Sequence, residues 1–570
     1  MHFPKENISL EVNEGERLSE AIRAAGLVLE TPCNGLGLCG KCRVKAWGDL
    51  CPPEDPESGF INPSNIRLAC LARARGDVWI ELPAKGNPLQ TINQGWAIEA
   101  EVDSPVKQVL LPPPEKTAQA YLARLAYNAC SADIYQKAGR LEQTGAQQVY
   151  GVLFDNLLVD LGTESNEILG VAIDIGTTGI SAYLLDLASG EILSKESCLN
   201  PQAEFGGDVL SRISYCLENP QGVTQLREVI IGKINQLVTD LMGSADRTER
   251  VYQVVLAGNT IMLHFVLGVY PGSIARAPYR PVFLEQVDLK ARELGIRICP
   301  EGRVTLLASA SGYVGADILA GLVATAFAKK DYPAVFLDIG TNGEIVAKLG
   351  GRLIATSTAA GPALEGMNIS CGCRAEAGAI DSCLIDERFE LHFTTIGEVQ
   401  AKGICGSGLI DITAAMVKRQ LVLAGGRFNP NLDPRIRARV RDKRFYLTEE
   451  IYISQTDIRQ IQLAKGAIAA GVALLLEEAG ISLEAIEEAV IAGAFGYHIN
   501  PDSIREIGLL PKGFQGKITF VGNSSAEGAR LALINQGVMT QIREMKQRIE
   551  VLELSTNPRF QDYFVKALGF

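Results

Sequence analysis

The chain contains the stretch Val171-Ala-Ile-Asp-Ile-Gly-Thr-Thr-Gly179 and, at a domain-sized distance, its near copy Val335-Phe-Leu-Asp-Ile-Gly-Thr-Asn-Gly343. Each copy is a continuous apolar run, typical of a buried strand, that ends in Asp-x-Gly-Thr. A strand pattern repeated at this spacing indicates a duplicated fold. We therefore expect two related lobes, each opening with a hairpin whose turn follows the aspartate.

Such turns expose backbone N–H groups and hydroxyls, which together suit a phosphate group. The aspartate before each turn can bind Mg²⁺ directly or through water. We predict that the catalytic residues are Asp174, Asp338 and, following the second turn, Glu344. The predicted cofactor-binding residues of the two turns are Gly176, Thr177 and Thr178, and Gly340, Thr341, Asn342 and Gly343.

Further glycine-rich segments strengthen this interpretation, because a single Asp-x-Gly-Thr is a weak signal. The run Val490-Ile-Ala-Gly493-Ala-Phe-Gly496 leads a strand into a glycine turn that could lie against an adenosine. No Walker-type or Rossmann-type glycine motif is apparent. The order of these elements resembles the actin, sugar kinase and heat-shock chaperone superfamily, in which two lobes clamp ATP. The resemblance adds to the nucleotide site Asn259, Gly406, Gly408, Gly493 and Gly496.

A second motif lies near the N-terminus, where Cys33-Asn-Gly-Leu-Gly-Leu-Cys39-Gly-Lys-Cys42 is followed at a distance by Cys70. Three cysteines on one glycine-rich loop plus one from elsewhere can hold a [2Fe-2S] cluster, with a first gap one residue longer than in plant-type ferredoxins. A zinc site or unrelated buried cysteines are the alternatives, but zinc ligands usually come as two short pairs. The strands expected around the loop resemble a β-grasp ferredoxin domain. The predicted metal ligands are therefore Cys33, Cys39, Cys42 and Cys70.

These motifs divide the chain into three parts and predict an α+β multidomain protein. We expect a ferredoxin-like domain over residues 1–85, a linker and small α+β middle domain over 86–168, and the duplicated α/β actin-like ATPase clamp over 169–570. Within the middle domain, residues 97–111 are predicted to form a strand, as are 148–154 and 156–161.

Composition narrows the function classes. The net charge of −12 argues against a nucleic-acid partner, which needs a basic surface. No uncharged apolar run of about eighteen residues appears, so no membrane partner is expected. Thirteen cysteines are an odd count that favours free thiols and cluster ligands. Because the first residues lack the apolar core of a signal peptide, we expect a cytoplasmic protein.

The combination of ferredoxin domain, small middle unit and ATPase clamp resembles the reductive activators of corrinoid proteins. Local strings that carry this resemblance include Gly315-Ala-Asp-Ile318 and Ser357-Thr-Ala-Ala-Gly-Pro-Ala-Leu-Glu-Gly366. The resemblance implies ATP-dependent transfer of one electron from a [2Fe-2S] cluster to an inactive Co(II) corrinoid, which returns it to Co(I). It further implies Mg²⁺ with the ATP, a corrinoid protein of a methyltransferase system as partner, a low-potential electron donor, and a homodimer.

Two other functions stay open at this point. An actin-fold small-molecule kinase with a fused redox-sensing ferredoxin domain would use the same clamp, and fold alone does not exclude it. An activator of a radical dehydratase shares the ATPase fold, although such activators are much shorter. The pair Cys371-Gly-Cys373 could form a second redox site, but two packed thiols in a glycine-rich turn are the simpler interpretation.

Overall fold

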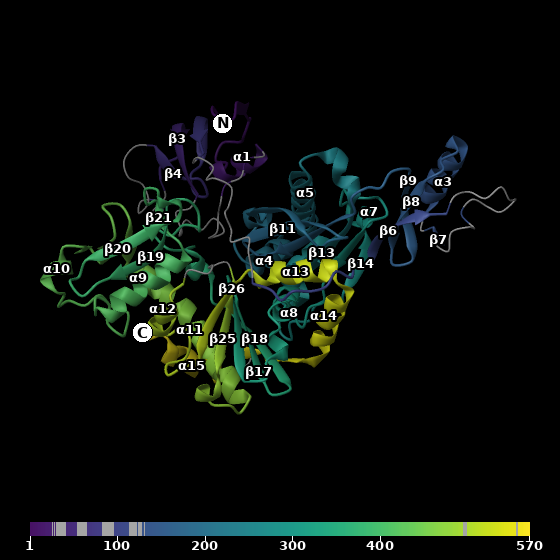
Figure 1. Cartoon of the computed structure of the whole chain (residues 1–570). Helices are drawn as coiled ribbons and strands as arrows, with labels where there is room; N and C mark the ends of the chain where they lie inside the picture. The colour runs from purple at the N-terminus through teal and green to yellow at the C-terminus, as the bar shows by residue number, and fades with distance from the viewer. Residues whose placement is uncertain are drawn as a thin grey trace.

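The computed structural model describes residues 1–25, 27, 29, 42–53, 57, 65–82, 96–112, 122, 128–129, 131–493, 499–554 and 557–570. Figure 1 shows a ferredoxin-like sheet at the N-terminus, two large lobes, and a small sheet at the far end of the first lobe. The predicted fold class, an α+β multidomain protein with an actin-like clamp, is confirmed. The predicted domain boundaries stay a prediction, and residues 83–95, where the first one falls, lie outside the described residues.

The N-terminal sheet is mixed and has one helix packed across it, as a β-grasp fold requires. Its strand order is β2-β1-β5-β3-β4, with β1 parallel to β5 and β3 antiparallel to both neighbours. Helix α1 buries Leu18, Ala21 and Ile22 against this sheet. The elements are β1 (His2–Phe3), β2 (Ile8–Ser9), α1 (Leu18–Ala24), β3 (Arg43–Leu50), β4 (Ile66–Leu68) and β5 (Ala74–Glu81).

A small four-stranded sheet with order β6-β8-β9-β7 follows, and α3 packs on it. The predicted strand over 97–111 is too long, since only its last six residues pair with β8. Before them, the N–H groups of Trp96, Ile98 and Asp103 donate to three different elements of the lobes, so no ladder forms. The elements are β6 (Val106–Leu111), β7 (Asn128–Ala129), α3 (Ala132–Thr144), β8 (Val149–Phe154) and β9 (Leu157–Gly162).

The two lobes share one strand order, which confirms the predicted duplication. The first sheet runs β12-β11-β10-β13-β15-β14 and the second β18-β17-β16-β25-β26, with β27 beyond β18. The strands of the first lobe are β10 (Leu169–Ile175), β11 (Gly179–Asp186), β12 (Ile192–Leu199), β13 (Val251–Gly258), β14 (Val287–Lys290) and β15 (Arg303–Leu306). Those of the second are β16 (Ala334–Ile339), β17 (Gly343–Leu349), β18 (Arg352–Thr358), β25 (Glu488–Ala492), β26 (Lys517–Gly522) and β27 (Ile549–Val551).

Two helices meet backbone to backbone between the lobes. Helix α8 (Ala316–Ala324) follows the last parallel strand of the first sheet, and α13 (Ser524–Ile534) holds the same place after the second. A Cβ atom on Gly528 would stand 2.3 Å from the carbonyl oxygen of Ala320. The absence of that side chain lets the helices approach, which brings the two hairpin turns together. Other helices of the lobes are α4 (Val209–Glu218), α5 (Gly222–Met242), α6 (Thr260–Leu267), α12 (Pro501–Ile507), α14 (Gln536–Arg548) and α15 (Phe560–Ala567).

The second lobe carries a large insertion between β18 and β25, visible as the green left-hand part of Figure 1. Helix α11 (Gln455–Glu478) within it is long and apolar enough to cross a membrane by those two criteria alone. However, 78% of its most apolar window is buried inside the protein, as in a core helix. The insertion also contains β19 (Ala379–Ile385), β20 (Leu391–Thr395), β21 (Gly403–Ile404), α9 (Gly406–Lys418), α10 (Pro434–Arg437), β22 (Val440–Arg441), β23 (Arg444–Tyr446) and β24 (Tyr452–Ser454).

Candidate functional site

A cavity of about 220 Å³ lies between the lobes, where the first hairpin turn of each lobe faces the other. Both turns come directly after a buried strand, β10 or β16, so the rigid sheets fix their position. The predicted residues that line this cavity are Asp174, Gly176, Thr177, Thr178, Asn259, Asp338, Gly340, Thr341, Asn342, Glu344, Gly406 and Gly493.

Each lobe places a glycine beside the end of its first strand. Gly258 ends β13 with φ +155°, and a Cβ atom there would stand 2.8 Å from the carbonyl oxygen of Ile175. Gly493 follows β25 with φ +119°, and its Cβ atom would stand 2.3 Å from that of Ile339. Both backbones therefore approach the strand that precedes a turn, which only glycine allows.

Asn259, the residue after Gly258, connects the first turn to a helix. Its side chain caps α6 by accepting from the Met262 N–H, and its Nδ2 donates to the Thr177 hydroxyl at 3.1 Å. The start of this helix is therefore joined to the turn through one amide. Such an arrangement presents N–H groups and hydroxyls to the cavity, where a phosphate needs donors.

The cavity is strongly acidic. Its lining holds five carboxyl groups, from Asp174, Asp317, Asp338, Glu344 and Glu365, and one basic side chain among its described residues, Arg374. Burial, together with the nearby charges of Asp174 and Glu365, raises the pKa of Asp338 to about 7. Burial and the Asp338 carboxylate likewise raise the pKa of Asp317 to about 8. Buried carboxylates this close to one another need a cation or protons.

Glu344 and Glu365 share this environment. Burial is the main reason why the pKa of Glu344 lies well above its usual value, and the charges of Asp317 and Asp338 also raise it. Its Oε1 accepts a hydrogen bond from the Ser357 hydroxyl at 3.2 Å. Burial also raises the pKa of Glu365, which accepts from the Thr178 hydroxyl at 3.1 Å.

Asp174 is held from the opposite lobe. The Ser525 hydroxyl donates to its Oδ1 at 2.7 Å, and the Asn523 side-chain amide donates to its Oδ2 at 3.0 Å. Both donors come from the start of α13. Although burial raises the pKa of Asp174, these two bonds favour its charged form. The two donors thus fix the orientation of the carboxylate.

Three predicted residues do not line the cavity within the described part of the chain. Gly408 lies inside α9, where a Cβ atom would stand 2.2 Å from the Ile380 carbonyl oxygen, so it serves close packing. Gly343 opens β17 and packs against Thr358 and Ile468. Gly496 lies outside the described residues.

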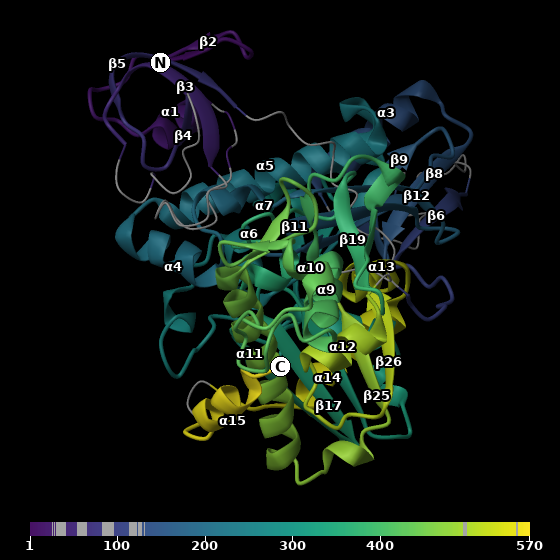
Figure 2. The ribbon, with the colours of Figure 1, turned by 90° about the vertical axis from the view of Figure 1, so that its left-hand side faces the viewer.

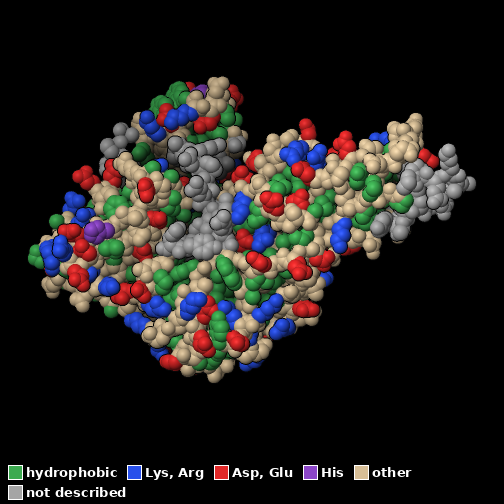
Figure 3. Space-filling view, viewed as in Figure 1, with side chains coloured by type: hydrophobic (Ala, Val, Ile, Leu, Met, Phe, Trp, Pro, Cys, Tyr) green, Lys and Arg blue, Asp and Glu red, His purple; other side chains and the backbone are tan. Residues whose placement is uncertain are grey.

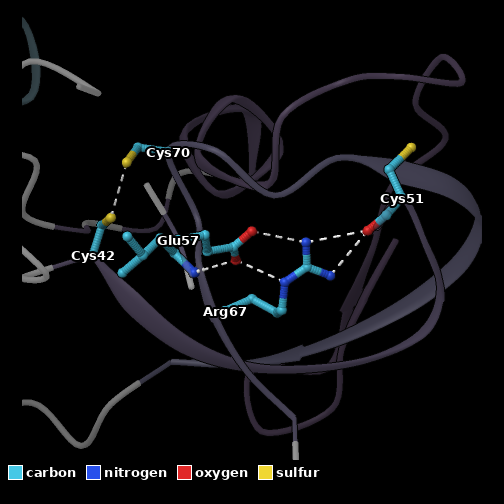
Figure 4. A network of polar contacts seen from close by, with 6 residues as sticks. Cys42, Cys51, Glu57, Arg67 and Cys70 are labelled. Carbon is cyan, nitrogen blue, oxygen red and sulfur yellow. Dashed lines mark hydrogen bonds and ion pairs between the residues drawn. The ribbon is translucent and has the colours of Figure 1, made fainter. Parts of the chain in front are cut away.

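The predicted cluster ligands that the structure describes come together in the N-terminal sheet. Cys42 precedes β3 and Cys70 lies in the turn after β4, and both are buried. Their sulfur atoms are 3.2 Å apart (Figure 4), longer than the ~2.05 Å of a disulfide bond. Two thiols that converge from separate segments fit neighbouring ligands of one iron site. Cys33 and Cys39 lie outside the described residues.

A buried ion pair supports the strand that leads to Cys70. The Arg67 guanidinium donates to both carboxylate oxygens of Glu57, at 2.7 and 2.9 Å, and to the Cys51 carbonyl at 3.1 Å (Figure 4). Glu57 Oε1 also accepts from the Leu68 N–H at 2.9 Å. The Cys51 sulfur points away from the Cys42–Cys70 pair, so Cys51 takes part in this network through its backbone carbonyl and not its thiol.

Comparisons with known proteins agree with this geometry. Three family models match: the 2Fe-2S iron-sulfur cluster binding domain over residues 2–75, the RACo middle region over 169–330, and the C-terminal ASKHA domain of RACo over 333–570. A solved structure, "Reductive activator for corrinoid, iron-sulfur protein", superposes with a TM-score of 0.77 at 32% identity, covering 100% of this chain and 98% of its own.

Curated relatives point the same way. The chain is 30% identical to "Corrinoid activation enzyme RamQ" of Eubacterium limosum, over 99% of this chain and 98% of the relative. The chain belongs to the RACo family. A more distant relative is "[Co(II) methylated amine-specific corrinoid protein] reductase" of Methanosarcina barkeri, at 27% identity over 70% of this chain and 77% of that protein.

In this RACo-family chain, the boundary between the two RACo models falls between α8 and β16, so the cavity is built by both matched regions. Membership also explains which site residues the sequence interpretation missed. Asp317 and Glu365 occur in the strings Gly315-Ala-Asp-Ile318 and Ser357 to Gly366, which carried the resemblance but were given no role. Asn523 and Ser525 gave no comparable signal.

Proposed function

We propose that this protein uses Mg-ATP to drive one electron from a [2Fe-2S] cluster onto the Co(II) form of a corrinoid protein, which yields Co(I). The observation that carries the proposal is that one chain joins a converging cysteine pair to an acidic cavity between duplicated hairpin turns. Family membership supports the same conclusion, because its relatives are named for corrinoid activation and Co(II) reduction.

Energetics give a reason for combining the two sites. Plant-type clusters have potentials of about −400 mV, and Co(I) is a stronger reductant than that, so the transfer is uphill. Each ~59 mV of deficit costs a factor of ten in the equilibrium constant for one electron. Nucleotide can offset this deficit by favouring a protein state that binds the Co(I) form better.

Residues of the cavity have distinct tasks in this proposal. The N–H groups and hydroxyls of Thr177, Thr178 and Thr341 bind phosphate oxygens. Asp174 and Asp338 would hold Mg²⁺, since both carboxylates line the cavity after equivalent strands. Glu344, oriented by Ser357, would accept a proton from the water that attacks ATP during its hydrolysis.

At the other end, Cys42 and Cys70, with Cys33 and Cys39, would ligate the cluster. When bound, a [2Fe-2S] cluster takes up and releases one electron at a time. Burial of the described thiols keeps water away from their sulfur atoms. We further propose a corrinoid protein of a methyltransferase system as the partner, a low-potential donor that reduces the cluster, a cytoplasmic location, and a homodimer.

The decisive experiment mixes the full chain, with its cluster reconstituted, with a corrinoid protein in the Co(II) form at limiting chemical reductant. Mg-ATP should produce Co(I) absorption at a rate well above that without nucleotide. Equal Co(I) formation with and without Mg-ATP would refute the coupling. Phosphorylation of a small acceptor instead of cobalt reduction would favour the kinase alternative.

A further inference from the structure

The helix before the cysteine loop contacts the first lobe of the clamp. From α1, Nη2 of Arg23 donates to the Glu204 carbonyl at 3.1 Å, and the guanidinium stands over the Phe205 ring at 5.6 Å. Phe205 in turn packs on the Tyr215 ring of α4 at 5.1 Å between centroids. Figure 2 shows the ferredoxin-like sheet standing above α4 on this side of the molecule. The contact therefore joins the redox domain to one short segment.

That segment, residues 200–218, comprises the 3₁₀ turn η1 (Pro201–Glu204) and helix α4. It also hydrogen-bonds to residues 176–178, the hairpin turn of the first lobe. The Asn200 side-chain amide donates to the Gly176 carbonyl at 2.8 Å, and its backbone N–H donates to the Thr178 carbonyl at 3.0 Å. Arg212 Nη2 donates to the Thr177 carbonyl at 2.6 Å. All three carbonyls of the turn 176–178 thus accept bonds from residues 200–218.

Arg212 is unusual because its guanidinium is fully buried. Besides the Thr177 carbonyl, it donates to the Gly206 carbonyl at 2.9 Å, the Gln202 side-chain oxygen at 3.4 Å and the Met262 sulfur at 3.2 Å. Among the residues that the structure describes, these hydrogen-bond partners are all neutral, and the charge of Asp208 offsets the cost of burial only through space. Burial lowers the pKa of Arg212 to about 9. A buried cation on neutral acceptors fixes the segment and the turn in one arrangement.

We propose that residues 200–218 are a coupling element through which docking of the ferredoxin domain, at Arg23, and phosphate binding at the turn 176–178 stabilise each other. This inference rests on the proposed nucleotide site. Arg212 acts as a positioning residue, because it holds the turn and not the nucleotide. Glu204 and Phe205 contact Arg23 of the ferredoxin domain. Asn200 and Arg212 of the same segment hydrogen-bond to the turn 176–178, so they transmit the docked state of the domain to that turn.

Thermodynamic linkage makes the coupling measurable from either side. If nucleotide strengthens docking by some factor, docking must strengthen nucleotide binding by the same factor. We expect the coupling to be positive, because the docked contact and the hydrogen bonds that restrain the turn involve the same segment. Loss of docking should free the turn and weaken nucleotide binding, although Arg23 lies in α1 of the N-terminal domain and does not line the cavity.

The experiment measures the affinity of the full chain for a non-hydrolysable ATP analogue with Mg²⁺ by calorimetry. Arg23→Ala should weaken binding about fivefold, and Phe205→Leu, which removes the ring beneath the guanidinium, should act in the same direction. The matched control is Arg75→Ala, which removes an exposed arginine from β5 of the same domain and should leave the affinity unchanged. Visible absorption verifies that each variant retains its cluster.

Arg212→Lys provides the second arm, because lysine keeps the charge but cannot span the same set of acceptors. It should weaken binding by itself and abolish the further effect of Arg23→Ala in the double variant. Changes below about twofold for both Arg23→Ala and Phe205→Leu would overturn the coupling. An undiminished Arg23 effect in the Arg212→Lys background would overturn the assigned route.

If Arg212→Lys does not fold, the two docking variants decide alone. A wild type that binds no nucleotide would refute the proposed function itself, whereas normal wild-type binding with inert docking variants would refute only the coupling.

Discussion

The hydroxyl oxygens of Thr178 and Thr341 lie 3.5 Å apart, although the two residues belong to different lobes. Each hydroxyl also reaches the carboxylate of Glu365, Thr178 at 3.1 Å and Thr341 at 3.4 Å. The equivalent turns of the duplicated fold therefore meet through these three side chains. A phosphate group that replaced Glu365 as their acceptor would therefore contact both lobes at once.

Asp338→Asn should separate the role of charge from that of shape. The amide keeps the size of the side chain but removes a negative charge that Mg²⁺ needs, so Mg-ATP affinity should fall about tenfold or more. Thermal stability without nucleotide should rise, because Asp174 and Glu365 no longer face a third carboxylate. The control Asp331→Asn, which removes an exposed charge from the loop before β16, should change neither quantity. Unaltered Mg-ATP affinity in Asp338→Asn would remove this residue from the metal site.

The pH dependence of stability follows from the raised pKa values of Asp338, about 7, and Asp317, about 8. Between the ordinary carboxyl pKa of ~4 and these values, the folded state binds more protons than the unfolded state. The nucleotide-free protein should therefore lose stability as pH rises from about 4 to about 8. Melting temperatures measured across this range would show the loss, and the double variant Asp317→Asn, Asp338→Asn should flatten it.

Mg-ATP binding should show the opposite trend, since Mg²⁺ at Asp338 requires that carboxylate in its ionised form and its charge favours ionisation of the neighbouring Asp317. Affinity should rise with pH through about 7 to 8, with protons released on binding, as the same two groups give up their protons. Calorimetry in buffers of different ionisation enthalpy measures the released protons. Binding that releases none at pH 6.5 would contradict the assignment.

Cys42→Ala should remove the visible absorption and the reduced-state EPR signal of the cluster, because one of two converging sulfur ligands is lost. Nucleotide affinity should decrease only slightly. Cys51→Ala is the matched control: the same domain loses a thiol whose sulfur points away from the pair, and the iron content should stay constant. A full complement of iron in the Cys42 variant would exclude this residue as a ligand.

Gly493→Ala tests the close approach beside Asp338. The methyl group would stand 2.3 Å from the Ile339 carbonyl oxygen at a φ of +119°, so we expect a loss of about 1–3 kcal/mol in the free energy of unfolding and a displaced Asp338. Denaturant titration and Mg-ATP affinity should both register the change. Gly351→Ala, in a turn with open space around it, should have an effect within about 0.5 kcal/mol.

The face of the molecule seen in Figure 3 offers no comparable guide to these residues. On this face, the described acidic and basic side chains are interspersed over both lobes. The carboxylates that we propose for the site lie in the cavity, so we expect their substitution to alter ligand binding.

Sequence reasoning succeeded where chemistry and strand pattern coincide. The hairpins around Asp174 and Asp338 were predictable because a continuous apolar run ends in a turn of small polar residues. Asp317 lies in one of the strings that carried the resemblance, but that string alone gave it no chemical role. Ser525 was missed because it begins a helix with no distinctive local pattern, and only sheet packing brings both residues to the cavity. The strand predicted over 97–111 was wrong at its start because its apolar alternation reflects packing on several elements and not one ladder.

The hydrogen bonds from Asn523 and Ser525 to Asp174 span most of the polypeptide. On the ribosome, the N-terminal sheet has all its strands once residue 81 has emerged, whereas β16 must wait for β25 and β26. The apolar strands of the second lobe therefore remain unpaired on one side during much of synthesis, a period of aggregation risk. The growing chain can therefore complete its ferredoxin-like sheet before its nucleotide cavity. A product truncated before β26 would contain the ferredoxin-like sheet but an incomplete nucleotide cavity.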